Sequence, residues 1–62
     1  MNGEEIKKRL INYIKNEGVN QAFICNKCAI ATSSLSKYKN GTHCLNNNEL
    51  SRLNEYLLSK GY

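Results

Sequence analysis

The stretch ICNKCAIATSSLSKYKNG, residues 24–41, allows two interpretations of the whole chain. Cys25 and Cys28 form a C-x-x-C pair, and His43 and Cys44 follow closely, as the ligands of a small zinc site could. The same residues also fit a helix, a tight turn and a second helix, with the cysteines as buried packing residues. The choice decides whether the chain holds a metal ion or binds a nucleic acid.

The length of the chain limits what it can do. A single domain, 1–62, of this size buries roughly 60% of its unfolded surface and has no room for a deep catalytic pocket beside its core. The sequence contains no Asp, and neither paired carboxylates nor a Ser-His-acid arrangement stands out. We therefore expect no enzymatic activity and no small-molecule substrate.

The distribution of apolar residues and cysteines indicates a cytoplasmic protein without a membrane partner. No apolar run approaches the roughly 20 residues that a membrane helix needs. The first ten residues, MNGEEIKKRL, lack the basic start and apolar stretch of a signal peptide. The three cysteines are an odd number, so a closed disulfide framework is not expected.

Positive charge gathers in the middle of the chain, whose net charge is +4. Residues 18–48 contain Lys27, Lys37 and Lys39 and no acid, whereas the two ends are nearly balanced. A local positive field suits a polyanion such as DNA.

Helix signals follow one another along the first two thirds of the chain. Apolar residues recur at three- and four-residue steps through 4–17, and Gly18 ends this predicted helix. Asn20 is expected to cap a second helix over 21–28. A third helix is predicted over 32–39, ending at the Asn-Gly pair 40–41.

The last part of the chain predicts a fourth helix. Asn46 and Glu49 resemble a capping box, and Leu50, Leu53 and Leu57 share one face of a helix that extends to about Ser59. No strand-like alternation is present. The fold class is therefore predicted as all-α: a compact bundle of four helices, or five with a short C-terminal turn.

Only about three residues separate the second and third predicted helices. Two helices joined so tightly must cross steeply, which predicts a helix-turn-helix at about 20–41. In the third helix Leu35 and Tyr38 should face the core, with Ala31 beside them. The opposite face is short, polar and basic, with Thr32, Ser33, Ser34, Ser36, Lys37 and Asn40. Small hydroxyl residues let a helix lie deep in the major groove, and a long Lys reaches base edges.

Residues 21–41 resemble the lambda-repressor-like (XRE/Cro) helix-turn-helix family. The family pattern is matched by Gln21, Ile24-Cys25, Cys28, Ile30, Leu35-Ser36 and Asn40-Gly41, and continues through Asn46 and Leu50 to Leu57. The family binds operator DNA, mostly as a dimer, with its third helix in the major groove. The resemblance therefore implies a small, nucleoid-associated transcriptional regulator, a repressor or Cro-like protein of a phage or mobile element. Its partner would be double-stranded DNA with a palindromic operator.

The resemblance also assigns residues by position. Base contacts are expected from Thr32, Ser33, Ser36 and Lys37. Contacts to the DNA backbone are expected from Asn20, Gln21, Ser34, Lys39, Asn40, Thr42 and His43. Two other functions stay open: a protein-interaction module such as an antitoxin-like partner, and a DNA accessory factor in excision or plasmid transfer.

The sequence departs from the family pattern in three places. Ala29 stands where the family often has Gly, so the positive φ of the turn would cost about 1–2 kcal/mol. Ala31 stands where Ser or Thr is preferred as a cap, and Thr32 or Ser33 is expected to replace it. After Tyr62 many relatives continue with a fifth helix that supports dimerisation.

We expect a homodimer that forms at least on its operator, with Tyr56, Leu58 and Tyr62 as its contact surface. These side chains exceed what one small core needs. The alternative is that Tyr56 and Leu58 only widen the core stripe of the fourth helix.

The zinc interpretation is the weaker one. Cys25 and Cys28 stand at i and i+3 on the inward face, and reduced Cys packs as a small hydrophobic residue. The ligands of zinc knuckles are usually spaced, whereas His43 and Cys44 are adjacent. We therefore expect core cysteines, no metal and no cofactor, with His43 facing a phosphate or solvent. Phe23 is expected near the surface, as a partner contact or simply exposed.

Overall fold

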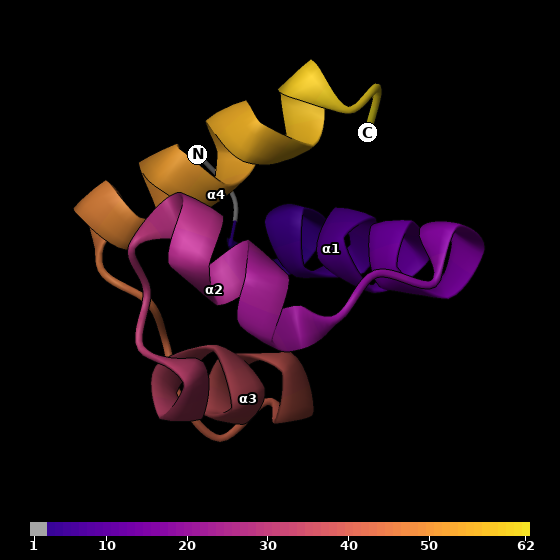
Figure 1. Cartoon of the computed structure of the whole chain (residues 1–62). Helices are drawn as coiled ribbons and strands as arrows, with labels where there is room; N and C mark the ends of the chain where they lie inside the picture. Colours follow the sequence, from indigo (N-terminus) through magenta and orange to yellow (C-terminus); the bar gives the residue numbers. More distant parts are fainter. Residues whose placement is uncertain (1–2) are drawn as a thin grey trace.

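The computed structural model describes residues 3–62, which form four α-helices and no strand. The helices are α1 (Gly3–Glu17), α2 (Gln21–Cys28), α3 (Thr32–Asn40) and α4 (Asn47–Ser59). In Figure 1, α2 lies between α3 and α4, and it contacts both of them. The α1 helix also packs against α3 and α4. The all-α prediction is confirmed, and a turn at Lys60 and Gly61 stands where a fifth helix was allowed.

Polar caps begin two of the helices as expected. The Asn20 side chain accepts a hydrogen bond from the Ala22 amide at 2.8 Å. Asn46 and Glu49 form the predicted capping box, with bonds of 2.8 and 3.1 Å. Each cap satisfies backbone N–H groups that a helix start leaves unpaired.

The start of α3 differs from the expectation. Ala31 itself is the N-cap residue, with extended backbone and no side-chain cap bond. Thr32 is already the first helical residue, so the prediction that Thr32 or Ser33 would replace the cap is wrong. Ala31 is also exposed and does not join Leu35 and Tyr38 in the core, because the helical wheel does not extend to a residue in extended conformation.

The turn between α2 and α3 is held by its backbone and by one side chain of α4. Ala29 has φ 55° and ψ 46°, which confirms the left-handed conformation expected there. The amides of Ala29 and Ile30 both donate to the Cys25 carbonyl. Arg52 donates from Nε to the Cys28 carbonyl at 2.7 Å and from Nη2 to the Ala29 carbonyl at 3.3 Å. A cation there also interacts favourably with the C-terminal end of the α2 dipole.

The core contains one face of each helix. Its buried residues are Ile6, Leu10, Tyr13, Ile24, Cys25, Cys28, Ile30, Leu35, Tyr38, Leu45, Leu50, Leu53 and Leu57. Cys25 and Cys28 are free thiols within it, so their interpretation as packing residues is confirmed. The Tyr38 hydroxyl donates to the Gly3 carbonyl and thereby ties α3 to the start of α1.

A cluster of tyrosines closes the α1–α4 side of the core. The Tyr13 and Tyr56 hydroxyls lie 3.1 Å apart, and the Tyr62 ring packs edge-on against Tyr13 at 5.1 Å between centroids. Tyr62 donates its hydroxyl to Glu17 at 2.8 Å, and its carbonyl accepts from Arg9 Nε at 2.6 Å. No helix of the described chain is both long and apolar enough to cross a lipid bilayer.

Replacing Ala29 with Gly should stabilise the protein by about 1 kcal/mol, because Gly adopts the left-handed conformation without the clash at Cβ. The measurement is the free energy of unfolding in urea. Ala22→Gly is the matched control: Ala22 is exposed within α2, where Gly should destabilise instead. An Ala29→Gly variant that is less stable than the parent would contradict the proposed strain.

Alkaline pH should weaken the fold through the tyrosine cluster. Burial, followed by the hydrogen bond with Tyr13, raises the pKa of Tyr56 from 10.0 to about 12. Because the folded state favours the neutral phenol, this contribution to stability is complete below pH 10 and is lost as pH rises towards 12. Burial also raises the pKa of Cys28 and Tyr38, so the stability that these two groups contribute changes with pH in the same direction.

The check is a series of urea unfolding curves between neutral pH and about pH 12, for the parent and for Tyr56→Phe. The variant should lose less stability across the alkaline range, because it lacks the Tyr56 phenol, whose pKa is raised in the folded state. Equal alkaline losses in the two proteins would show that Tyr56 is not responsible.

Candidate nucleic-acid interface

The outward face of α3 presents the side chains that the sequence assigned to base contacts. Thr32, Ser33 and Lys37 are exposed, and Ser36 is half-buried. Ser33, Ser36 and Lys37 stand at i, i+3 and i+4, so they share one side of the helix. Leu35 and Tyr38 are buried on the opposite side and fix the helix on the core. Hydroxyl donors and one long cation therefore point away from a firmly packed helix.

The C-terminal end of α3 leads directly into the loop that was expected to meet the DNA backbone. Gly41 adopts φ 86° and its amide bonds the carbonyls of Lys37 and Tyr38. Thr42 donates to the Lys37 carbonyl from its amide at 2.9 Å and from its hydroxyl at 3.2 Å. The Thr42 hydroxyl proton is thus already used to end the helix. Asn40 and His43 are exposed at the same end.

The start of α2 contributes Asn20 and Gln21. Asn20 is exposed, but its side-chain oxygen is engaged by the Ala22 amide, which leaves the amide nitrogen as the group that could donate to a phosphate. Gln21 is half-buried and stands at the first position of the helix. The positive end of a helix dipole also favours an anion there.

Lysines from α2 and α3 add positive charge to this part of the chain. Lys37 is exposed and Lys39 half-buried on α3, and Ser34 is half-buried between the two faces. Lys27 on α2 lies 5.4 Å from the ring centroid of Phe23, a cation–π contact at the surface.

Lys7 is a basic residue that sequence reasoning did not connect with this surface. Its Nζ lies 4.0 Å from the position that a Cβ would take on Gly41, although it is also paired with Glu4 at 3.2 Å. The proximity depends on how α1 packs against α3, and no local pattern in the sequence marks it.

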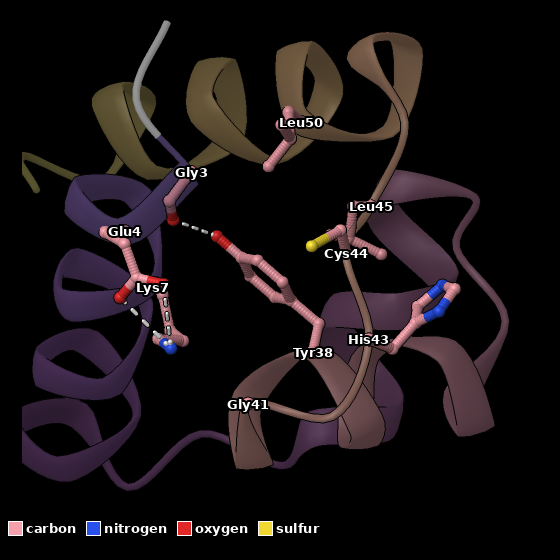
Figure 2. A pocket seen from close by; sticks show the side chains of 9 residues that line it. All are labelled: Gly3, Glu4, Lys7, Tyr38, Gly41, His43, Cys44, Leu45 and Leu50. Carbon is pink, nitrogen blue, oxygen red and sulfur yellow. Dashed lines mark hydrogen bonds and ion pairs between the residues drawn. The ribbon is translucent and has the colours of Figure 1, made fainter.

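A pocket of about 310 Å³ lies behind this loop, between α1, α3 and α4 (Figure 2). Figure 2 shows the Tyr38 side chain crossing from α3 to Gly3. Cys44 lies on the Tyr38 side of the loop, and the His43 imidazole lies on the other side. Burial, then Glu4 and Cys44, raise the pKa of the Tyr38 hydroxyl, so this phenol stays neutral and holds its bond to α1.

The residues of the zinc interpretation do not form one site. Cys25 and Cys28 are buried on α2, whereas Cys44 is exposed in the loop before α4. Within residues 3–62, no three side chains of His, Cys, Asp or Glu come together as metal ligands would.

The three residues expected at a dimer contact have different environments. Tyr56 is half-buried against Tyr13, and Lys60 Nζ lies 5.7 Å from the centroid of its ring. Tyr62 is half-buried and folded back on α1. Leu58 is 61% exposed, so it is the member of this group that is open to a partner.

Comparison with protein-family models, with curated proteins and with solved structures finds no match for this chain. A functional interpretation therefore depends on the chain's own geometry and chemistry.

Proposed function

We propose that this protein binds double-stranded DNA in a sequence-specific manner and acts as a small transcriptional regulator of the lambda-repressor-like type. The observation that carries the proposal is the outward face of α3. It presents hydroxyl groups and a lysine within a segment, residues 18–48, that has no acidic residue. An ordinary solvated helix face more often mixes acids and bases. The three-residue link to α2 adds support, because so short a connection is typical of the helix-turn-helix.

In this proposal α3 enters the major groove and α2 lies across the DNA backbone. Lys37 can reach acceptors on guanine, and Thr32, Ser33 and Ser36 can approach base edges closely because they are short. Lys39, Asn40 and His43 approach phosphates at one end of α3. Asn20 and Gln21 approach a phosphate at the start of α2. Ser34 and Thr42 have less scope, since Ser34 is half-buried and the Thr42 hydroxyl is bonded to Lys37.

A protein-interaction module is the second candidate. Phe23 is 47% exposed and Leu58 is 61% exposed, and an exposed large apolar side chain can anchor a protein partner. Binding to a defined duplex separates the two functions, because an interaction module has no preferred DNA sequence. The salt dependence of binding adds a count of phosphate contacts.

Lys37→Ala should weaken binding to the preferred duplex by about 1–3 kcal/mol and relax the preference at one base position. Lys39→Ala should weaken binding to all sequences by similar amounts, because a phosphate contact carries no sequence information. The measurement is selection of bound sequences from a random duplex pool, followed by affinity at fixed salt. Lys60→Ala, at the far end of α4, is the control for general loss of charge. Unchanged affinity and an unchanged selected sequence for Lys37→Ala would mean that α3 does not read the DNA.

The protein should bind a palindromic site as a homodimer. One such module covers roughly 600–1,000 Å², which is small for tight specific binding. Two copies with their α3 helices in successive major grooves would stand about 34 Å apart. Among the three residues expected at this contact, Leu58 is the exposed one, so Leu58→Glu should reduce cooperative binding. Sedimentation with and without the palindromic duplex measures the assembly.

Asn12→Glu is the control for the dimer experiment, since it adds the same negative charge at an exposed position of α1 without removing apolar surface. If the Leu58→Glu variant still occupies both halves of the palindromic site with full cooperativity, the dimer contact does not involve Leu58.

A further inference from the structure

A second pocket lies on the surface between α1 and α3, away from the pocket of Figure 2. Its volume is about 250 Å³, and its lining residues are Ile11, Ile14, Lys15 and Lys39. We call it the Ile11 groove. Ile11 is 40% exposed, and Ile14 is half-buried against the core. The groove therefore has an apolar floor that this chain leaves open to solvent.

Two lysines, Lys15 and Lys39, line the groove beside that floor. Residues three and four positions away on a helix are surface neighbours. For Ile11 these neighbours are Lys7, Lys8, Lys15 and Ile14, and α3 adds Lys39 from across the groove. Lys7 is paired with Glu4 at 3.2 Å and lines the pocket of Figure 2, so the positive charge at the groove comes from Lys15, Lys39 and the neighbouring Lys8. The four side chains that line the groove include no acid.

The size of the groove favours one large side chain over a small organic ligand. Its volume is below the roughly 300–1,000 Å³ of typical small-molecule sites. Burial of a Leu or Phe side chain contributes binding free energy, whereas Ile11 and Ile14 offer no hydrogen bond to a polar ligand. Lysine stems can cover the edges of such a side chain while their ammonium groups stay in water.

We propose that the Ile11 groove binds an acidic segment of a partner protein, in which a Leu- or Phe-sized side chain is flanked by Asp or Glu. The apolar side chain would cover Ile11 and Ile14, and the carboxylates would meet Lys15, Lys39 and the neighbouring Lys8. This partner complements both the floor and the rim. A DNA backbone would satisfy the lysines but would leave the isoleucines in water. The proposal does not depend on DNA binding, because the groove and its charges belong to the free protein.

The test is a nuclear magnetic resonance titration of the isotope-labelled full chain, without DNA. The probe is a short blocked peptide of Asp and Glu with a Leu-Phe pair at its centre. The methyl resonances of Ile11 and Ile14 and the amides of Lys15 and Lys39 should shift together. A peptide with Ser-Ser at its centre, and one with Asn and Gln in place of the acids, should each bind at least about tenfold more weakly.

Surface variants locate the site. Ile11→Asp and the double change Lys15→Glu with Lys39→Glu should each abolish binding of the acidic peptide. Leu58→Asp and Lys60→Glu are the matched controls, because they change an exposed apolar residue and a lysine outside the groove. Both controls should bind as the parent does. The lysine double variant also tests the site if Ile11→Asp fails to fold.

Three results would overturn the proposal. The first is equal binding of the Ser-Ser peptide, which would mean that the lysines attract any polyanion. The second is undiminished binding by the lysine double variant. The third is that the acidic peptide shifts no resonance while a DNA duplex shifts the Ile11 methyl resonances. This result would assign the groove to the DNA backbone.

Discussion

The contact of Arg52 with the end of α2 stabilises the turn from which α3 starts. Its guanidinium bonds the carbonyls of Cys28 and Ala29, at the point where the chain turns in a left-handed conformation. Two carbonyls that α2 cannot satisfy internally thus gain a cationic donor from α4. The turn is strained at Ala29 and stabilised by a residue far along the chain. The direction of α3 is therefore a property of the whole fold and not of the turn residues alone.

The inner side of α3 explains how its outer side can be polar. Leu35 is fully buried, and Tyr38 extends through the core to bond the Gly3 carbonyl. Leu35 and Tyr38 are the buried residues of this nine-residue helix. Its other side is not needed for packing and can therefore hold short hydroxyl residues and Lys37. The Thr42 amide and hydroxyl then end the helix at the Lys37 carbonyl, which fixes the base of that lysine. A rigid backbone beneath exposed donors is what groove recognition requires.

The sequence was sufficient for features set by local chemistry. Helix periods, the Asn20 and Asn46 caps and the burial of Cys25 and Cys28 all follow from residues close together in the chain. It was not sufficient for features set by packing. Leu45 is buried in a loop that has no period, and Arg52 reaches a turn 24 residues away. In the candidate site, the shared face of α3 was predictable from spacing. Two other features were not predictable from the sequence: the position of Lys7 beside Gly41, and the hydrogen bond from the Thr42 hydroxyl to the Lys37 carbonyl.

Lys39 links the two proposed surfaces. It stands on α3 among the residues proposed for the DNA backbone, and it also lines the Ile11 groove on α1. An ammonium group that bonds a carboxylate in the groove is not available to a phosphate, and the added acidic segment would repel the DNA nearby. An acidic partner in the groove would therefore weaken DNA binding without covering Lys37 or the hydroxyl groups of α3. Such a partner would reduce affinity for all sequences and leave the preferred sequence unchanged, since the residues proposed to contact bases would stay free.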